Sequence, residues 1–193
     1  MTAPKQADVA IIITSTRLVR VGPAIANIVK DILEKEDGNE AKFSLVDLAD
    51  FKLPIYDECV VPYQVPSRAT YANEHSRRWS AEISKYDAYI LVIPEYNYGV
   101  AGSTKNAIDY LRKNASEQVK VSLEGTELRV SPTRPQLIFA KDGETSDIFA
   151  AMHKGELGEK SREVWTTENK KDIVKAFEEL KEAIKNPPAS KEK

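Results

Sequence analysis

The sequence of 193 residues lacks the features that mark several common protein classes. Its single cysteine, Cys59, excludes an internal disulfide and suits a reducing compartment. The first apolar run, residues 9–13, is too short for a signal peptide, and no run reaches the roughly 20 apolar residues that span a bilayer. The formal net charge of −2 gives no electrostatic reason to expect a nucleic acid. We therefore expect a cytoplasmic protein with neither a membrane nor a nucleic acid as its partner.

Several catalytic motifs are also missing. The two histidines, His75 and His153, do not have the spacing of metal ligands, so no metal site is predicted. No G-x-S-x-G sequence occurs, which argues against a serine hydrolase. The chain also has neither a G-x-G-x-x-G dinucleotide fingerprint after its first strand nor a Walker-type phosphate loop. Any phosphate site must therefore be built in another way.

The regular pattern of the first 111 residues indicates an α/β protein. Three short apolar runs are typical of buried parallel strands, and they cover residues 9–13, 43–48 and 86–93. Helical patterns follow them, beginning near Pro23, covering residues 68–84, and following residues 99–102. Strand–helix alternation of this kind predicts a doubly wound parallel sheet in a single domain, residues 1–193.

The last third is less regular. Residues 119–123 and 128–130 could form a hairpin, or the first segment could be a helix end. Residues 136–140 suit a strand or an extended segment, and residues 168–186 suit a final amphipathic helix. Residues 1–6 and 187–193 are expected to be disordered.

The loop after the first strand, residues 14–22, is a candidate anion site. It contains three hydroxyl side chains, Arg17 and Arg20, and lies directly before a helix N-terminus. No acidic residue occurs from Val9 to Lys30, so nothing nearby in sequence neutralises the arginines. A phosphate subsite is the functional interpretation, and a polar turn with solvated arginines is the alternative.

The loop after the third strand, residues 94–99, is the second candidate. It carries two tyrosines, an asparagine and a turn glycine, in the order Pro94-Glu95-Tyr96-Asn97-Tyr98-Gly99. Flat aromatic side chains can flank a conjugated ring, while amide groups meet its polar edge. The alternative is a tyrosine-rich turn that packs on a neighbouring helix.

Together these segments resemble a known family. The sequence Ser15-Thr16-Arg17-x-x-Arg20-x-Gly22-Pro23, residues 94–99, and Lys105-Asn106-Ala107-Ile108-Asp109 are similar to motifs of the NAD(P)H-dependent FMN reductases. Fungal quinone reductases are the nearest relatives by this resemblance. It extends from about Val9 to Leu111 and resumes, more weakly, from about Leu128.

The resemblance implies a flavodoxin-like fold that binds FMN and uses NAD(P)H to reduce quinones or free flavin in a ping-pong cycle. The flavin carries the chemistry, so no catalytic side chain is required. By the family's pattern, the cofactor-binding residues are Ser15, Arg17, Arg20, Gly22, Pro94, Glu95, Tyr96, Asn97, Tyr98 and Gly99. A homodimer or homotetramer is also implied.

The chain departs from the family pattern after Asn114. About two dozen residues that normally hold a fourth strand and a Gly-Gly loop over the flavin have no counterpart here. The fourth-strand region is therefore expected to be missing or rebuilt, which removes or alters one wall of the flavin site. The alternative function is a degenerate family member with weak or no FMN binding that acts as a binding or regulatory protein, or a truncated product.

Overall fold

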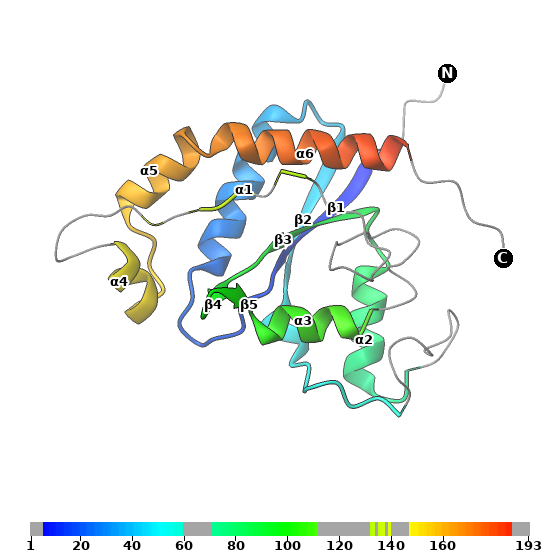
Figure 1. Cartoon of the computed structure of the whole chain (residues 1–193). Helices are drawn as coiled ribbons and strands as arrows, with labels where there is room; N and C mark the ends of the chain where they lie inside the picture. The colour runs from blue at the N-terminus through cyan, green and yellow to red at the C-terminus, as the bar shows by residue number, and fades with distance from the viewer. Residues whose placement is uncertain are drawn as a thin grey trace, which may run out of the picture.

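The computed structural model describes residues 6–59, 71–111, 132–133, 135–137, 139 and 147–186. Its parallel sheet contains β1 (Ala7–Ile13), β2 (Ala41–Asp47) and β3 (Ala88–Val92), in the order β2–β1–β3 (Figure 1). The register pairs Ile13 with both Asp47 and Val92, so the three strands end together. This order is the beginning of the flavodoxin-like arrangement, in which ligands bind beyond the carboxyl ends of the strands.

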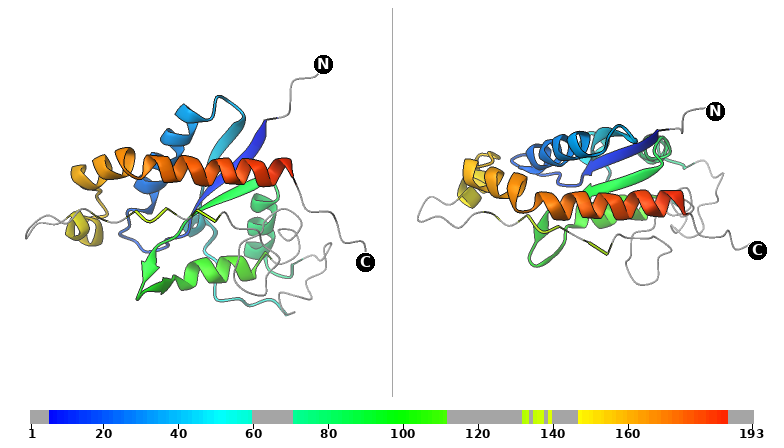
Figure 2. Two further views of the ribbon diagram at one scale, coloured as in Figure 1. Left: turned by 45° about the horizontal axis from the view of Figure 1, so that its top comes forward. Right: turned by 90° about the horizontal axis from the view of Figure 1, so that it is seen from above.

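Helices cover both faces of the sheet. The helices α1 (Gly22–Glu36) and α6 (Lys170–Lys185) pack on one face, and α2 (Glu74–Ile83) and α3 (Gly102–Asp109) pack on the other. Two shorter helices, α4 (Asp147–His153) and α5 (Glu159–Thr167), precede α6. Figure 2 shows α4 at the end of the molecule opposite the last turn of α6.

The middle strand supplies side chains to two separate hydrophobic clusters because successive strand residues face opposite sides. Val9, Ile11 and Ile13 enter the cluster beneath α1 and α6, where Trp165 is fully buried. Ala10 and Ile12 enter the cluster beneath α2 and α3, around Trp79. Every residue of β1 from Val9 to Ile13 is at most 4% exposed. The continuous apolar run in the sequence therefore reflects burial on both faces.

The expected α/β architecture and its first three strands are confirmed, with different boundaries. The first strand begins at Ala7, and Gln6, expected to be disordered, donates hydrogen bonds to the carbonyls of Asn39 and Ala41. The second helix was expected from residue 68, but α2 begins at Glu74. The helices α4 and α5 were not predicted.

The region expected to be shortened lies largely outside the described residues. Within the part of the chain that the structure describes, the parallel sheet has three strands. The possible hairpin at residues 119–130 and the expected disordered tail fall in undescribed segments. Leu137 and Phe139 pack against the cluster beneath α1 and α6, but neither has strand geometry. No helix among the described residues is long and apolar enough to cross a membrane.

Candidate functional site

Thr14 joins the carboxyl ends of β1 and β3 to the start of α3. Its backbone N–H and its hydroxyl both donate to the carbonyl oxygen of Val92, each at 3.1 Å. The Thr104 hydroxyl donates to the Thr14 hydroxyl at 2.7 Å, and the Ser103 hydroxyl donates to the Thr14 carbonyl at 2.8 Å. This buried network fixes the point where the loop leaves the sheet.

Ser15 follows Thr14 and carries a buried hydroxyl with no hydrogen-bond partner among the described residues. The hydroxyl lies against Gly22, where an added Cβ would overlap it. Gly22 is the first residue of α1, which has Pro23 in its first turn, no side-chain cap and no acidic residue there. An orphaned hydroxyl beside an uncapped helix N-terminus is suited to an anion such as phosphate.

The second loop folds into a small hairpin. Its strands, β4 (Glu95–Tyr96) and β5 (Gly99–Val100), are antiparallel, and Asn97 and Tyr98 between them have φ of 51° and 61°. Two successive positive φ angles are typical of a type I′ turn. The Tyr98 side chain at the tip is 99% exposed.

The two predicted loops meet through Arg17 and Tyr96. The Arg17 Nε donates to the Tyr96 hydroxyl at 3.1 Å, and the guanidinium carbon lies 5.5 Å from the centre of the Tyr96 ring. Arg17 forms no ion pair with any residue that the structure describes. Its positive charge therefore lies beside the Tyr96 ring of the hairpin.

Arg20 has a different environment. Its guanidinium forms a bidentate pair with Asp47 at the end of β2, with N···O distances of 2.9 and 2.7 Å. It also donates to the carbonyl oxygen of Ser15 at 3.0 Å. The sequence contains no acid near the loop, but the parallel register places Asp47 beside it. Sequence reasoning missed Asp47 because the partners are 27 residues apart.

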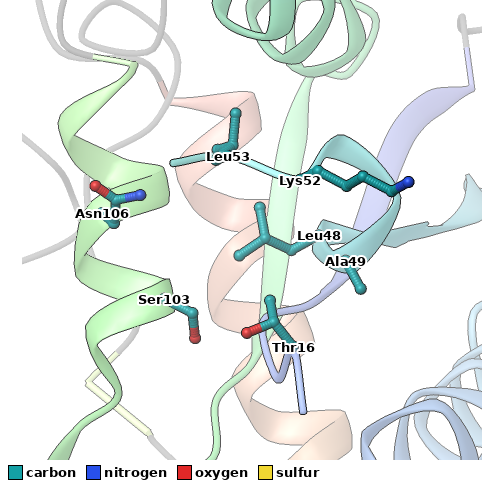
Figure 3. A pocket seen from close by; sticks show the side chains of 7 residues that line it. All are labelled: Thr16, Leu48, Ala49, Lys52, Leu53, Ser103 and Asn106. Atoms are coloured by element: carbon teal, nitrogen blue, oxygen red, sulfur yellow. The ribbon is translucent and has the colours of Figure 1, made fainter. Parts of the chain in front are cut away.

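A cavity of about 250 Å³ adjoins this loop on the α3 side (Figure 3). It lies between the loop after β1, the short helix η1 (Leu48–Phe51) and α3. The side chains that line it are Thr16, Leu48, Ala49, Lys52, Leu53, Ser103 and Asn106. In Figure 3 the Lys52 ammonium points away from the cavity. The remaining lining consists of hydroxyl groups, the Asn106 amide and aliphatic side chains.

A polar network around Asp57 joins the start of α2 to the end of α3. The Asp57 carboxylate accepts hydrogen bonds from Tyr110 at 2.8 Å and from Asn73 at 3.0 Å, and it pairs with His75 at 2.9 Å. Desolvation acts to raise the pKa of Asp57, but these hydrogen bonds outweigh it and lower the pKa. Burial and the Asp57 hydrogen bond raise the pKa of Tyr110. Among the described residues, no group of three His, Cys, Asp or Glu side chains could hold a metal ion.

Comparison with known proteins places the chain in a family. Residues 7–125 match the family model described as NADPH-dependent FMN reductase. The chain is 40% identical over 201 aligned positions to the NAD(P)H-dependent FMN reductase ntnL of a Nectria species, covering 94% of this chain and 98% of that protein. It is 38% identical over 108 positions to LOT6 of Saccharomyces cerevisiae, another NAD(P)H-dependent FMN reductase, with 53% and 56% of the two chains covered.

A solved structure is also similar in part. The flavoenzyme NAD(P)H:(acceptor) oxidoreductase FerB of Paracoccus denitrificans is 26% identical, with a TM-score of 0.39. The match covers 54% of this chain and 50% of FerB. In the Nectria comparison, 94% of the 193 residues is about 181, so about 20 of the 201 aligned positions have no residue of this chain.

The fold defines a flavodoxin-like α/β protein with a candidate anion site at the carboxyl end of its sheet. The chain belongs to the NADPH-dependent FMN reductase family, and it is an oxidoreductase whose cofactors are FMN and NAD(P)H. The resemblance based on the two loops is thereby confirmed. The Ser15 hydroxyl and the uncapped α1 N-terminus fit the FMN phosphate.

Proposed function

We propose that FMN binds with its phosphate at the N-terminus of α1 and its ring system beside the hairpin. Ser15, Arg17 and Gly22 would hold the phosphate. Arg20 belongs to the same loop, where it donates a hydrogen bond to the Ser15 carbonyl. The residues proposed for the ring are Pro94, Glu95, Tyr96, Asn97, Tyr98 and Gly99. The observation that carries the proposal is the buried Ser15 hydroxyl, which has no partner among the described residues and faces the uncapped helix.

The residues of this chain bind and orient, while the cofactor supplies the chemistry. When bound, FMN supplies hydride transfer from NAD(P)H to an acceptor. We infer that the acceptor is a quinone or free flavin and that the cycle is ping-pong. Support comes from the family and from its named fungal relatives. The tyrosine side chains of the hairpin are exposed, so a planar acceptor could reach them from solvent.

We also infer that the protein acts in the cytoplasm as a homodimer or homotetramer. The single cysteine, Cys59, is a free thiol, which suits a reducing compartment. The oligomeric state follows from the family resemblance, and sedimentation of the purified protein measures it. A monomer at micromolar concentration would contradict this inference.

The central experiment is an FMN titration of the purified protein, followed in the visible spectrum. Saturable spectral changes of the flavin are expected, together with NAD(P)H oxidation when a quinone or free FMN is supplied. Varying both substrates should give parallel double-reciprocal lines, because a ping-pong cycle releases one product before the second substrate binds. A colourless protein that fails to bind added FMN would overturn the proposal and favour a degenerate family member.

A further inference from the structure

We propose that Asp47 and Arg20 are positioning residues for the FMN phosphate loop, residues 14–22, and that Arg20 acts through this loop without touching the phosphate. The inference rests on the proposed function, because it concerns the same cofactor site. It assigns a role to Asp47, an acid that lies outside both predicted loops and belongs to a neighbouring strand.

The geometry of Arg20 directs its guanidinium away from solvent and into the protein. Both terminal nitrogens are used by Asp47, and one of them also donates to the Ser15 carbonyl. The two side chains are only 17% and 22% exposed. A planar bidentate pair of this kind fixes orientation as well as distance. Arg20 therefore connects the backbone of Ser15 to the edge of β2.

Asp47 is itself held rigidly. It is the last residue of β2 and lies opposite Ile13 in the parallel register, two residues before Ser15. Its carboxylate also accepts the backbone N–H of Ala49 at 3.0 Å, which caps η1. The position of the carboxylate is therefore set by the sheet and by a helix start, and this rigidity passes through Arg20 to the loop.

A second contact restrains the backbone of Arg20. Gly155, just after α4, has φ of +71°, and an added Cβ there would lie 3.1 Å from the Arg20 nitrogen and 3.2 Å from its carbonyl oxygen. Such a close approach between two backbones leaves the loop little freedom on that side. The side chain of Arg20 is held by Asp47, and its main chain is confined by Gly155.

The charge balance distinguishes positioning from direct binding. Asp47 neutralises Arg20, and a guanidinium that turned toward the phosphate would leave the Asp47 carboxylate half-buried and unpaired. Arg17 has no such acid among the residues described.

The two roles therefore predict opposite effects for Asp47→Asn. Direct binding predicts tighter FMN binding, because a restrained cation is released; positioning predicts weaker binding, because the loop loses its support.

The test is a titration of the Asp47→Asn apoprotein with FMN and, separately, with riboflavin, which has no phosphate. We expect FMN affinity to fall about tenfold and riboflavin affinity to stay unchanged. The Asp50→Asn variant, which removes an exposed acid from η1, is the matched control and should bind both flavins as wild type does. Arg20→Lys keeps the charge but loses the bidentate geometry, and it should reproduce the loss seen in Asp47→Asn.

The outcomes separate the two proposals. Unchanged or tighter FMN binding by Asp47→Asn would overturn the positioning role, and so would an equal weakening of both flavins, which a general structural loss would produce. Normal FMN binding by Arg20→Lys would also contradict it. A wild-type protein that binds neither flavin would overturn the proposed function itself, and this inference with it.

Discussion

At the scale of single residues, the contact between Ser15 and Gly22 decides the shape of the anion site. A buried hydroxyl without a partner costs free energy, so the position of Ser15 is retained only if the surrounding backbone enforces it or a ligand satisfies it. Gly22 provides the space for this hydroxyl at the first residue of α1. Glycine is therefore needed at this position because it has no side chain, and not because of its backbone conformation, since its φ is not in the left-handed region.

Gly22→Ala tests this contact. The new Cβ would overlap the Ser15 hydroxyl and lie 2.9 Å from Cγ2 of Ile13, so one of these groups must move. We expect stability to fall by about 1–3 kcal/mol through overpacking, and FMN affinity to fall as the hydroxyl is displaced. Urea unfolding and FMN titration measure the two effects.

The matched control for this substitution is Gly102→Ala at the start of α3, where an added Cβ meets nothing within 4 Å. It should leave FMN binding unchanged and slightly increase stability, because alanine favours the helix. If Gly22→Ala behaved like Gly102→Ala, the hydroxyl would not define the site.

The sequence allowed the loop positions to be predicted, but it could not reveal their partners. Hydroxyl and arginine residues after a buried strand were sufficient to single out the loop around Ser15 and Arg17 as a candidate anion site. The Arg20–Asp47 pair joins residues from two strand ends, and only the parallel register brings them together. The contact between Gly155 and Arg20 spans an even longer stretch of chain. Local sequence patterns carry no information about such pairs.

At the scale of elements, Asp57 connects the segment after η1 to two helices. Asn73 is the N-cap residue of α2, His75 lies in its first turn, and Tyr110 is the C-cap residue of α3. All three meet the same carboxylate. This arrangement fixes the positions of α2 and α3 relative to each other on one face of the sheet, and it depends on Asp57 being ionised.

The ionisation of Asp57 predicts how stability changes with pH. Because the folded-state pKa is lowered from the ordinary 3.8, its contribution is fully present above that value and is lost as the pH falls through the folded-state pKa. Asp57→Asn should therefore be less stable than wild type at pH 7, and the difference should shrink as the pH falls below 3.8. Urea unfolding across this range measures it.

Asp31→Asn, an exposed acid on α1, is the control for the pH series. It removes a carboxylate of the same type without touching α2 or α3, so it should follow wild type at every pH. A stability difference between Asp57→Asn and wild type that is as large in acid as at neutral pH would show that the carboxylate charge is not what matters.

The unpredicted helices show why some elements escape sequence reasoning. The α4 and α5 helices contain 7 and 9 residues, too few for a clear helical pattern. The α5 N-cap residue, Gly158, has no side chain to cap with, but the Asp147 carboxylate of α4 accepts the backbone N–H of Ser161 at 2.7 Å. The cap thus comes from another helix, while α6, with Ile173 and Phe177 buried on one face, was predictable from its own pattern.

At the scale of the whole molecule, one strand connects both halves of the core. The cluster beneath α1 and α6 and the cluster beneath α2 and α3 each contain alternate residues of β1. Neither cluster can lose this strand without exposing the other. We therefore expect the chain to unfold as one cooperative unit, as the single-domain prediction requires, even though the described sheet has three strands.

The two tryptophans provide a direct test, because each reports on one face. Trp165 is 0% exposed in the first cluster and Trp79 is 1% exposed in the second, where its indole N–H donates to the Ala107 carbonyl at 3.0 Å. The variants Trp79→Phe and Trp165→Phe leave one tryptophan each, which can be excited selectively at the red edge of the absorption band. Within each variant, the fluorescence transition in urea should coincide with the loss of helical circular dichroism. In Trp165→Phe, an earlier fluorescence transition would show that the α2–α3 face opens first.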